Sequence, residues 1–193
     1  MSNIHIIQII SQIIWFFPAL RQYNEKLFYF FLVLALADPI SLLFLFITKI
    51  HPAPFFPLVS SLILVLTVIG KEKLKTYSFH IVVTYFILIL IPIIIGSRSF
   101  YYLLFSLLHI FVIYNIFGLF IKSYLKENVI NIFYVLIILY ELLNIFKVLN
   151  IVFQFPNVSL FLNTTLFFQV ILGLYFSIVK ESSPKNFFRF KTL

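Results

Sequence analysis

The sequence predicts an all-α membrane protein: a bundle of seven transmembrane helices with the amino terminus outside and the carboxyl terminus in the cytoplasm. Three observations carry this prediction, namely the composition, seven apolar stretches of spanning length, and alternating positive charge between them. Of the 193 residues, 63% are hydrophobic and only 10% are charged, whereas soluble domains average about 25% charged residues. A soluble protein of this size could not bury so much apolar surface, so an ordinary soluble domain is excluded.

The first four apolar stretches are bounded by charged residues, proline or glycine, and each approaches the length of about 20 residues that spans a bilayer. Residues 4–20 lack the basic start of a cleaved signal peptide, so we expect a helix that stays in the membrane. Residues 27–48 lie between two lysines, residues 52–70 end at a glycine, and residues 77–96 follow a segment with three lysines. Each stretch is therefore predicted as a transmembrane helix.

The last three stretches are bounded in the same way. Residues 100–121 follow a short turn of glycine, serine and arginine, residues 129–151 follow an asparagine, and residues 158–179 end at a lysine. The joints are too short to hold a separate domain, so residues 1–179 are predicted as one seven-helix transmembrane domain. Residues 180–193 are predicted as a basic cytoplasmic tail, either a frayed terminus or an amphipathic segment on the lipid surface.

Positive charge alternates along the chain and sets the predicted orientation. The segments after the first, third, fifth and seventh stretches hold eleven of the fourteen lysines and arginines, and the other three are Lys49, Arg98 and Lys147. Positive residues accumulate on the cytoplasmic side of a membrane, which places the amino terminus outside. We expect the protein in the inner membrane of a bacterium. Because the basic residues lie at helix ends, we expect the lipid bilayer as partner and no nucleic acid.

Several polar side chains fall near the middle of the predicted helices. They are Asp38, Ser60, Ser61, His109, Glu141 and Gln169. At a rise of 1.5 Å per residue, the two carboxyls and the imidazole reach one depth, although an acid there costs roughly 2.5–3.5 kcal/mol on insertion scales. This layer predicts a cavity that binds a small ligand or a proton. The alternative left open is that these groups only hydrogen-bond one helix to another.

Three prolines are candidate hinges, and one lysine is expected at the membrane surface. Pro39 follows the acid of the second stretch directly and removes a helical hydrogen bond there. Pro18 and Pro92 offer further pivots, although proline is also simply tolerated in membrane helices. Lys147 is expected to extend outward to the membrane surface.

Several kinds of chemistry have no motif in this sequence. The chain has no cysteine, which excludes disulfides and thiolate metal sites. It has no H-E-x-x-H, G-x-S-x-G or glycine-rich phosphate motif, and no lysine in the last stretch that would bind retinal. We therefore expect no cofactor, no metal and no enzyme activity.

The layout of the chain resembles a broad set of small, uncharacterised seven-helix membrane proteins of Bacteroidota and related bacteria, which are sensor-like. The resemblance lies in RQYNEKLFYFFL before Asp38, in YELLNIFK around Glu141 and in LFFQVILGLYFSIVKE of the last stretch. It implies the fold of the membrane part of a seven-helix sensor kinase without the kinase.

A weaker resemblance links the stretch IIQIISQIIWFFPALRQYN to the first helix of the PQ-loop and sugar-transporter family. Pro18 stands at the proline of that motif, whereas Ala19 replaces its glutamine, and the fifth stretch has no matching proline. This resemblance implies a seven-helix transporter built from repeats.

We therefore expect a sensor-like or accessory integral membrane protein that binds a small ligand, a lipid or a partner membrane protein. A small-solute transporter of the PQ-loop type and a structural subunit of a membrane complex are the alternatives.

Overall fold

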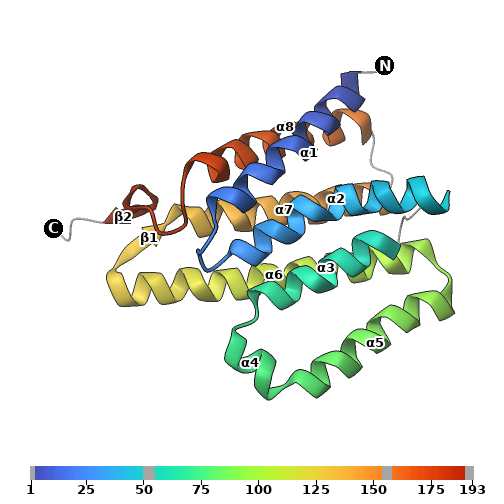
Figure 1. The fold of residues 1–193 in the computed structure, drawn as a ribbon, viewed down its shortest axis with the longest axis horizontal. Helices are drawn as coiled ribbons and strands as arrows, with labels where there is room; N and C mark the ends of the chain where they lie inside the picture. The colour runs from blue at the N-terminus through green and yellow to red at the C-terminus, as the bar shows by residue number, and fades with distance from the viewer. Residues whose placement is uncertain (1–2, 50–54, 154–157, 190–193) are drawn as a thin grey trace.

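The computed structural model describes residues 3–49, 55–153 and 158–189. This part of the chain is almost entirely helical, as predicted, with eight α-helices and two short strands (Figure 1). The helices are α1 (Asn3–Arg21), α2 (Phe28–Thr48), α3 (Phe55–Val68), α4 (Lys71–Thr76), α5 (Ser78–Ile95), α6 (Arg98–Glu127), α7 (Ile132–Phe153) and α8 (Val158–Ile178). The other elements are β1 (Val129–Asn131), a 3₁₀ turn (Pro184–Asn186) and β2 (Phe187–Arg189). Seven of the helices lie over the seven predicted stretches, and α4 occupies the lysine-rich joint between two of them.

Four helices in the described ranges are long and apolar enough to cross a membrane. They are Phe28–Thr48, Ser99–Lys126, Ile132–Phe153 and Leu160–Ile178. The apolar parts of the other three long helices are shorter, at Ile9–Arg21, Phe55–Val68 and Ser78–Pro92. Large apolar side chains remain exposed along all of these helices, which indicates a membrane-embedded protein.

Six of the helices form a closed ring. Neighbours around it are α1, α2, α3, α6, α7 and α8, and α8 returns to pack against α1. The contact between the first and last helices thus closes the ring (Figure 1). Because helices from both ends of the sequence face the centre, residues far apart in the chain can meet there.

Helix α5 lies outside the ring. It touches α3 and α6 over short stretches only, and it diverges from α6 after the turn that joins them (Figure 1). Gly96, with φ of 66°, makes that turn, in a backbone conformation that glycine adopts without strain. The Tyr85 hydroxyl ties α5 to α3 by donating to the Leu62 carbonyl oxygen at 2.6 Å.

The first and last helices run parallel and approach each other closely at Gly173. A Cβ atom placed on this glycine would lie 2.7 Å from Ile14 Cγ2, which is too close for any other residue without a shift. Next to this contact, aromatic rings fill the core. The ring centroids of Trp15 and Tyr140 are 4.5 Å apart, and those of Phe31 and Phe176 are 5.1 Å apart.

The strands correct two predicted boundaries. Asn128 has a positive φ of 52° and ends α6, so α6 continues past the predicted end at 121. Val129 to Asn131 then pair antiparallel with Phe187 to Arg189, and the predicted helix 129–151 begins instead at Ile132. The Asn131 side chain caps this helix by accepting from Phe133 N at 3.0 Å.

The segment after α8 is packed rather than frayed. Asn186 is fully buried, and its amide donates to the carbonyl oxygens of Lys180 and Glu181 at 2.7 and 3.0 Å. Its own Oδ1 accepts from the Tyr175 hydroxyl at 2.7 Å. The tail therefore folds back onto the bundle as far as residue 189, and residues 190–193 lie outside the described part.

Candidate ligand cavity

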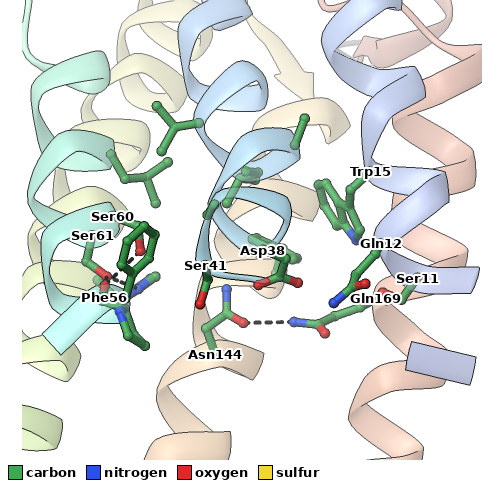
Figure 2. A pocket seen from close by; sticks show the side chains of 18 of the residues that line it. Ser11, Gln12, Trp15, Asp38, Ser41, Phe56, Ser60, Ser61, Asn144 and Gln169 are labelled. Atoms are coloured by element: carbon green, nitrogen blue, oxygen red, sulfur yellow. Dashed lines mark hydrogen bonds between the residues drawn. The ribbon is translucent and has the colours of Figure 1, made fainter. Parts of the chain in front are cut away.

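A cavity of about 260 Å³ lies inside the ring. All six ring helices contribute to its wall, and α5 does not. Its polar lining consists of Ser11, Gln12, Asp38, Ser41, Ser60, Ser61, His109, Asn144, Lys147 and Gln169. Figure 2 shows the two sides of this cavity, with the serines of α3 on one side and Gln12, Asp38 and Gln169 on the other.

The structure brings the six predicted site residues together. Asp38, Ser60, Ser61, His109 and Gln169 all line the cavity. Glu141 is fully buried behind His109, to which it is bonded. Sequence reasoning placed Asp38, His109 and Glu141 at one depth and the other three slightly lower, and the structure shows that five of the six residues line one cavity. That they bind a ligand or a proton stays a prediction.

Three of these residues form a hydrogen-bonded chain across three helices. The Ser61 hydroxyl on α3 lies 3.1 Å from His109 Nε2 on α6, and His109 Nδ1 is bonded to Glu141 Oε2 on α7. The Phe105 ring lies against the imidazole, with 4.1 Å between ring centroids. The imidazole is thus held on both nitrogens and on one face.

The first turn of α3 positions the two serines. Pro57 lies in that turn, where the missing N–H of a proline is tolerated. Its carbonyl oxygen accepts from Ser60 Oγ at 2.9 Å and from Ser61 Oγ at 2.7 Å. Only Ser61 also reaches His109, so the two adjacent hydroxyls lie in different surroundings.

Burial of the Glu141 carboxyl group costs desolvation free energy. It has no exposed surface, and among the described residues its Oε1 has no hydrogen-bond partner. An amide or an apolar residue would avoid the desolvation of a carboxyl group. Buried polar groups without partners often mark functional positions, so the chain from Ser61 to Glu141 needs more than a packing explanation.

The cavity lining also carries two charges and a set of amides, which come from α1, α2, α7 and α8. Asp38 is exposed and lines the cavity together with Gln12 and Lys147. The Lys147 ammonium donates to Gln169 Oε1, and Gln169 Nε2 donates to Asn144 Oδ1 at 2.8 Å (Figure 2). The prediction that Lys147 extends outward is therefore wrong, because its ammonium donates to the buried Gln169 amide inside the ring.

Sequence reasoning missed Lys147 and Asn144 as members of the site, although a signal was present. Tyr140, Asn144 and Lys147 are spaced four and three residues apart and so share one face of a helix. All three line the cavity. Glu141 lies next to this face. A polar stripe beside a predicted intramembrane acid could therefore have indicated that Asn144 and Lys147 belong to the site.

The three candidate hinges fall at different places. Pro39 lines the cavity, next to Asp38. Pro18 lies near the end of α1, where its carbonyl oxygen accepts from Gln22 N at 2.8 Å. Pro92 lies near the end of α5, outside the ring, and its carbonyl oxygen accepts from Gly96 N at 2.9 Å. Of the three, only Pro39 is placed where a bend would change the cavity.

A second polar network closes the end of the bundle near β1 and β2. The buried Glu181 carboxylate accepts from Leu27 N at 2.9 Å and from the Tyr134 hydroxyl at 2.8 Å. Burial raises the pKa of Glu181, while these two hydrogen bonds and the charge of Lys26 oppose the rise. Burial also lowers the pKa of Lys26.

Within the described ranges, no three histidine or acidic side chains are grouped so as to hold a metal ion. Comparison with known proteins gave no match to a family model, to a curated protein or to a solved structure.

Proposed function

We propose that this protein is a seven-span, sensor-like or accessory protein of a bacterial inner membrane, and that its central cavity binds a small polar ligand. The observation that carries the proposal is the pair of opposite charges that line the cavity, Asp38 on α2 and Lys147 on α7, framed by amides. Charged side chains at membrane depth normally face a cavity and serve a substrate, an ion or a proton.

The membrane arrangement follows from helix length and charge. At 1.5 Å per residue, the 19 residues of α1 and the 18 of α5 reach about 27–29 Å, close to the roughly 30 Å of a hydrocarbon core. Helices α1 and α8 are parallel, which fits an odd number of spans between the same two faces. The basic segments at the end near β1 and β2 favour that end as the cytoplasmic one.

The cavity favours a small ligand that carries both charges. A positive group would meet Asp38, and a negative group would meet Lys147, whose present partner is a neutral amide that a stronger acceptor can displace. A volume of about 260 Å³ limits the bound part to a small molecule or the head group of a larger one.

The test is ligand-induced stabilisation of the purified protein in detergent. Zwitterionic, cationic and anionic small molecules are compared by the melting temperature of the wild type, of Asp38→Asn and of Lys147→Gln. Glu72→Gln, in exposed α4, is the matched control. We expect stabilisation by a zwitterion that both cavity variants lose and the control keeps. Equal responses in all four proteins would reject the cavity as the binding site and favour a structural subunit.

Transport of the same ligand is the second candidate function. It is favoured by Pro39, because a bend at this residue would open or close the wall next to Asp38. Counterflow in liposomes separates the two functions, since a transporter shows saturable flux and a sensor shows none.

A further inference from the structure

We propose that Ser61, His109 and Glu141 form an activated-serine site that reacts covalently with the carboxylic ester of an amphiphile. This goes beyond reversible ligand binding and departs from the expectation that the protein is no enzyme. That expectation rested on motifs, whereas these residues come from α3, α6 and α7 and share no local motif.

The geometry has the three roles that an activated nucleophile requires. A hydroxyl lies within hydrogen-bond reach of an imidazole nitrogen, at 3.1 Å, and the other nitrogen of the same ring is bonded to a carboxyl group. Such an arrangement is recognised by geometry rather than by position in the chain, and it recurs on unrelated folds. Ser61 and His109 line the cavity, so both can meet a substrate, and Glu141 is a positioning residue behind them.

The Glu141 carboxylate decides which ring nitrogen of His109 carries the proton. With Glu141 ionised, His109 donates Nδ1–H to it, which leaves Nε2 as an acceptor. The single proton of Ser61 is then shared between His109 Nε2 and the Pro57 carbonyl oxygen, at 3.1 and 2.7 Å. Rotation of the hydroxyl toward the ring completes the hydrogen bond used in the reaction.

The reaction is an ordinary acyl transfer. Ser61 Oγ bonds to the ester carbonyl carbon as its proton passes to His109 Nε2. The tetrahedral intermediate then breaks its bond to the alkoxy oxygen, which takes this proton and leaves as an alcohol. Water attacks the acyl-serine with the same base, releases a carboxylic acid and restores the hydroxyl.

Stabilisation of the oxyanion must come from side chains. Ser61 lies inside α3, where the backbone N–H groups are already used by the helix. Ser41 and Asn144 are polar groups on the cavity wall that could donate instead. Loss of one oxyanion donor typically slows an enzyme by about 10²–10³, so we expect slow turnover and choose covalent labelling as the readout.

The surroundings point to an amphiphilic ester. An apolar groove of about 800 Å³ between α1 and α2 meets the polar cavity, because Gln12 and Pro39 line both. The rest of the groove is lined mainly by exposed aliphatic and aromatic side chains such as Ile13, Phe16 and Leu43. A chain of methylene groups fits there while the polar end reaches the cavity.

The experiment is labelling of the full chain, in detergent, with a long-chain alkyl fluorophosphonate, followed by mass spectrometry of the labelled peptide. We expect the label on Ser61. Ser61→Ala should abolish it, and Ser60→Ala, the adjacent hydroxyl that does not reach His109, should keep it. His109→Gln should slow labelling at least about 100-fold, the lower range for loss of a general base.

Glu141 needs a separate readout, because its loss could act through stability. Glu141→Gln keeps the shape and loses the charge, so labelling should fall while the melting temperature stays near that of the wild type. Glu141→Asp should recover part of the rate. Recovery with aspartate and loss with glutamine identify the charge as the requirement, whereas a parallel change in melting temperature identifies a structural role and overturns the assignment.

Two results would overturn the proposal directly. One is a folded, monodisperse wild type that takes no more label than heat-denatured protein, and the other is undiminished labelling of Ser61→Ala. Labelling no faster with the long-chain probe than with a methyl fluorophosphonate would overturn the amphiphile assignment. Reversible binding of a zwitterion without any labelling would leave the proposed function intact and reject only the activated serine.

Discussion

Gln22 and Glu181, 159 residues apart in the sequence, join the two ends of the chain: the Glu181 backbone N–H donates to Gln22 Oε1 at 2.9 Å. The Gln22 amide in turn donates to the carbonyl oxygens of Phe176 and Val179 at 2.9 and 2.7 Å. Carbonyls at the end of α8 that have no helical partner are thus satisfied by the turn after α1. This junction fixes the ring and, through it, the cavity.

Replacement of Gln22 by leucine should destabilise the protein by about 1–3 kcal/mol, because it leaves buried backbone groups without partners. The measurement is the free energy of unfolding by denaturant in mixed micelles. Asn115→Leu is the control, since this exposed amide bonds only within its own helix. Equal stability of the two variants would contradict the importance of the junction.

The stability of the junction should depend on pH through Glu181. Burial raises the pKa of this carboxyl above its ordinary value of 4.5, so the folded protein holds the proton more tightly than the unfolded chain. The stabilisation is therefore complete below pH 4.5 and is lost as the pH rises through the raised value. The measurement is the melting temperature of the wild type and of Glu181→Gln across this pH range. As the pH rises, the wild type should lose stability relative to Glu181→Gln, which cannot ionise. A pH-independent difference would contradict the role of Glu181.

Gly173→Val should destabilise the protein by about 1–3 kcal/mol through overpacking against Ile14. Gly118→Val is the matched control, because Gly118 is also helical and has nothing within 4 Å of its Cβ position. Melting temperatures in detergent compare the two. A smaller effect at position 173 than at position 118 would mean that α1 and α8 do not approach as described.

The orientation is tested by reporters of periplasmic and cytoplasmic location fused after Leu193. The positive-inside distribution predicts activity of the cytoplasmic reporter only. Periplasmic activity would mean an even number of spans or the reverse orientation.

The sequence was informative wherever one segment decided its own structure. Helix positions followed from apolar length, because a lipid solvent forces backbone hydrogen bonds to close within each segment. The strands could not be foreseen, since Val129 to Asn131 adopt their conformation by pairing with Phe187 to Arg189, which lie far along the chain. Three-residue strands also carry no periodicity of their own.

The site was predictable in part for the same reason. Depth along each helix placed Asp38, His109 and Glu141 together, since the helical rise is constant. Rotation about the helix axis is set by packing against neighbours, so the sequence could not separate Ser61 from Ser60. It also misplaced Lys147, whose hydrogen-bond partner Gln169 lies on another helix.

The closed ring is the central claim, because without it Asp38, Lys147, Ser61 and His109 would not line one cavity. The chain has no native cysteine, so Ile14→Cys combined with Gly173→Cys tests the ring by disulfide formation in membranes. The short distance from the Gly173 Cβ position to Ile14 Cγ2 puts this pair within the range of disulfide geometry. We predict rapid oxidation to an internal disulfide that Ile14→Cys with Gly118→Cys does not form; a pair at 14 and 173 that stays reduced under the same oxidant would contradict the ring.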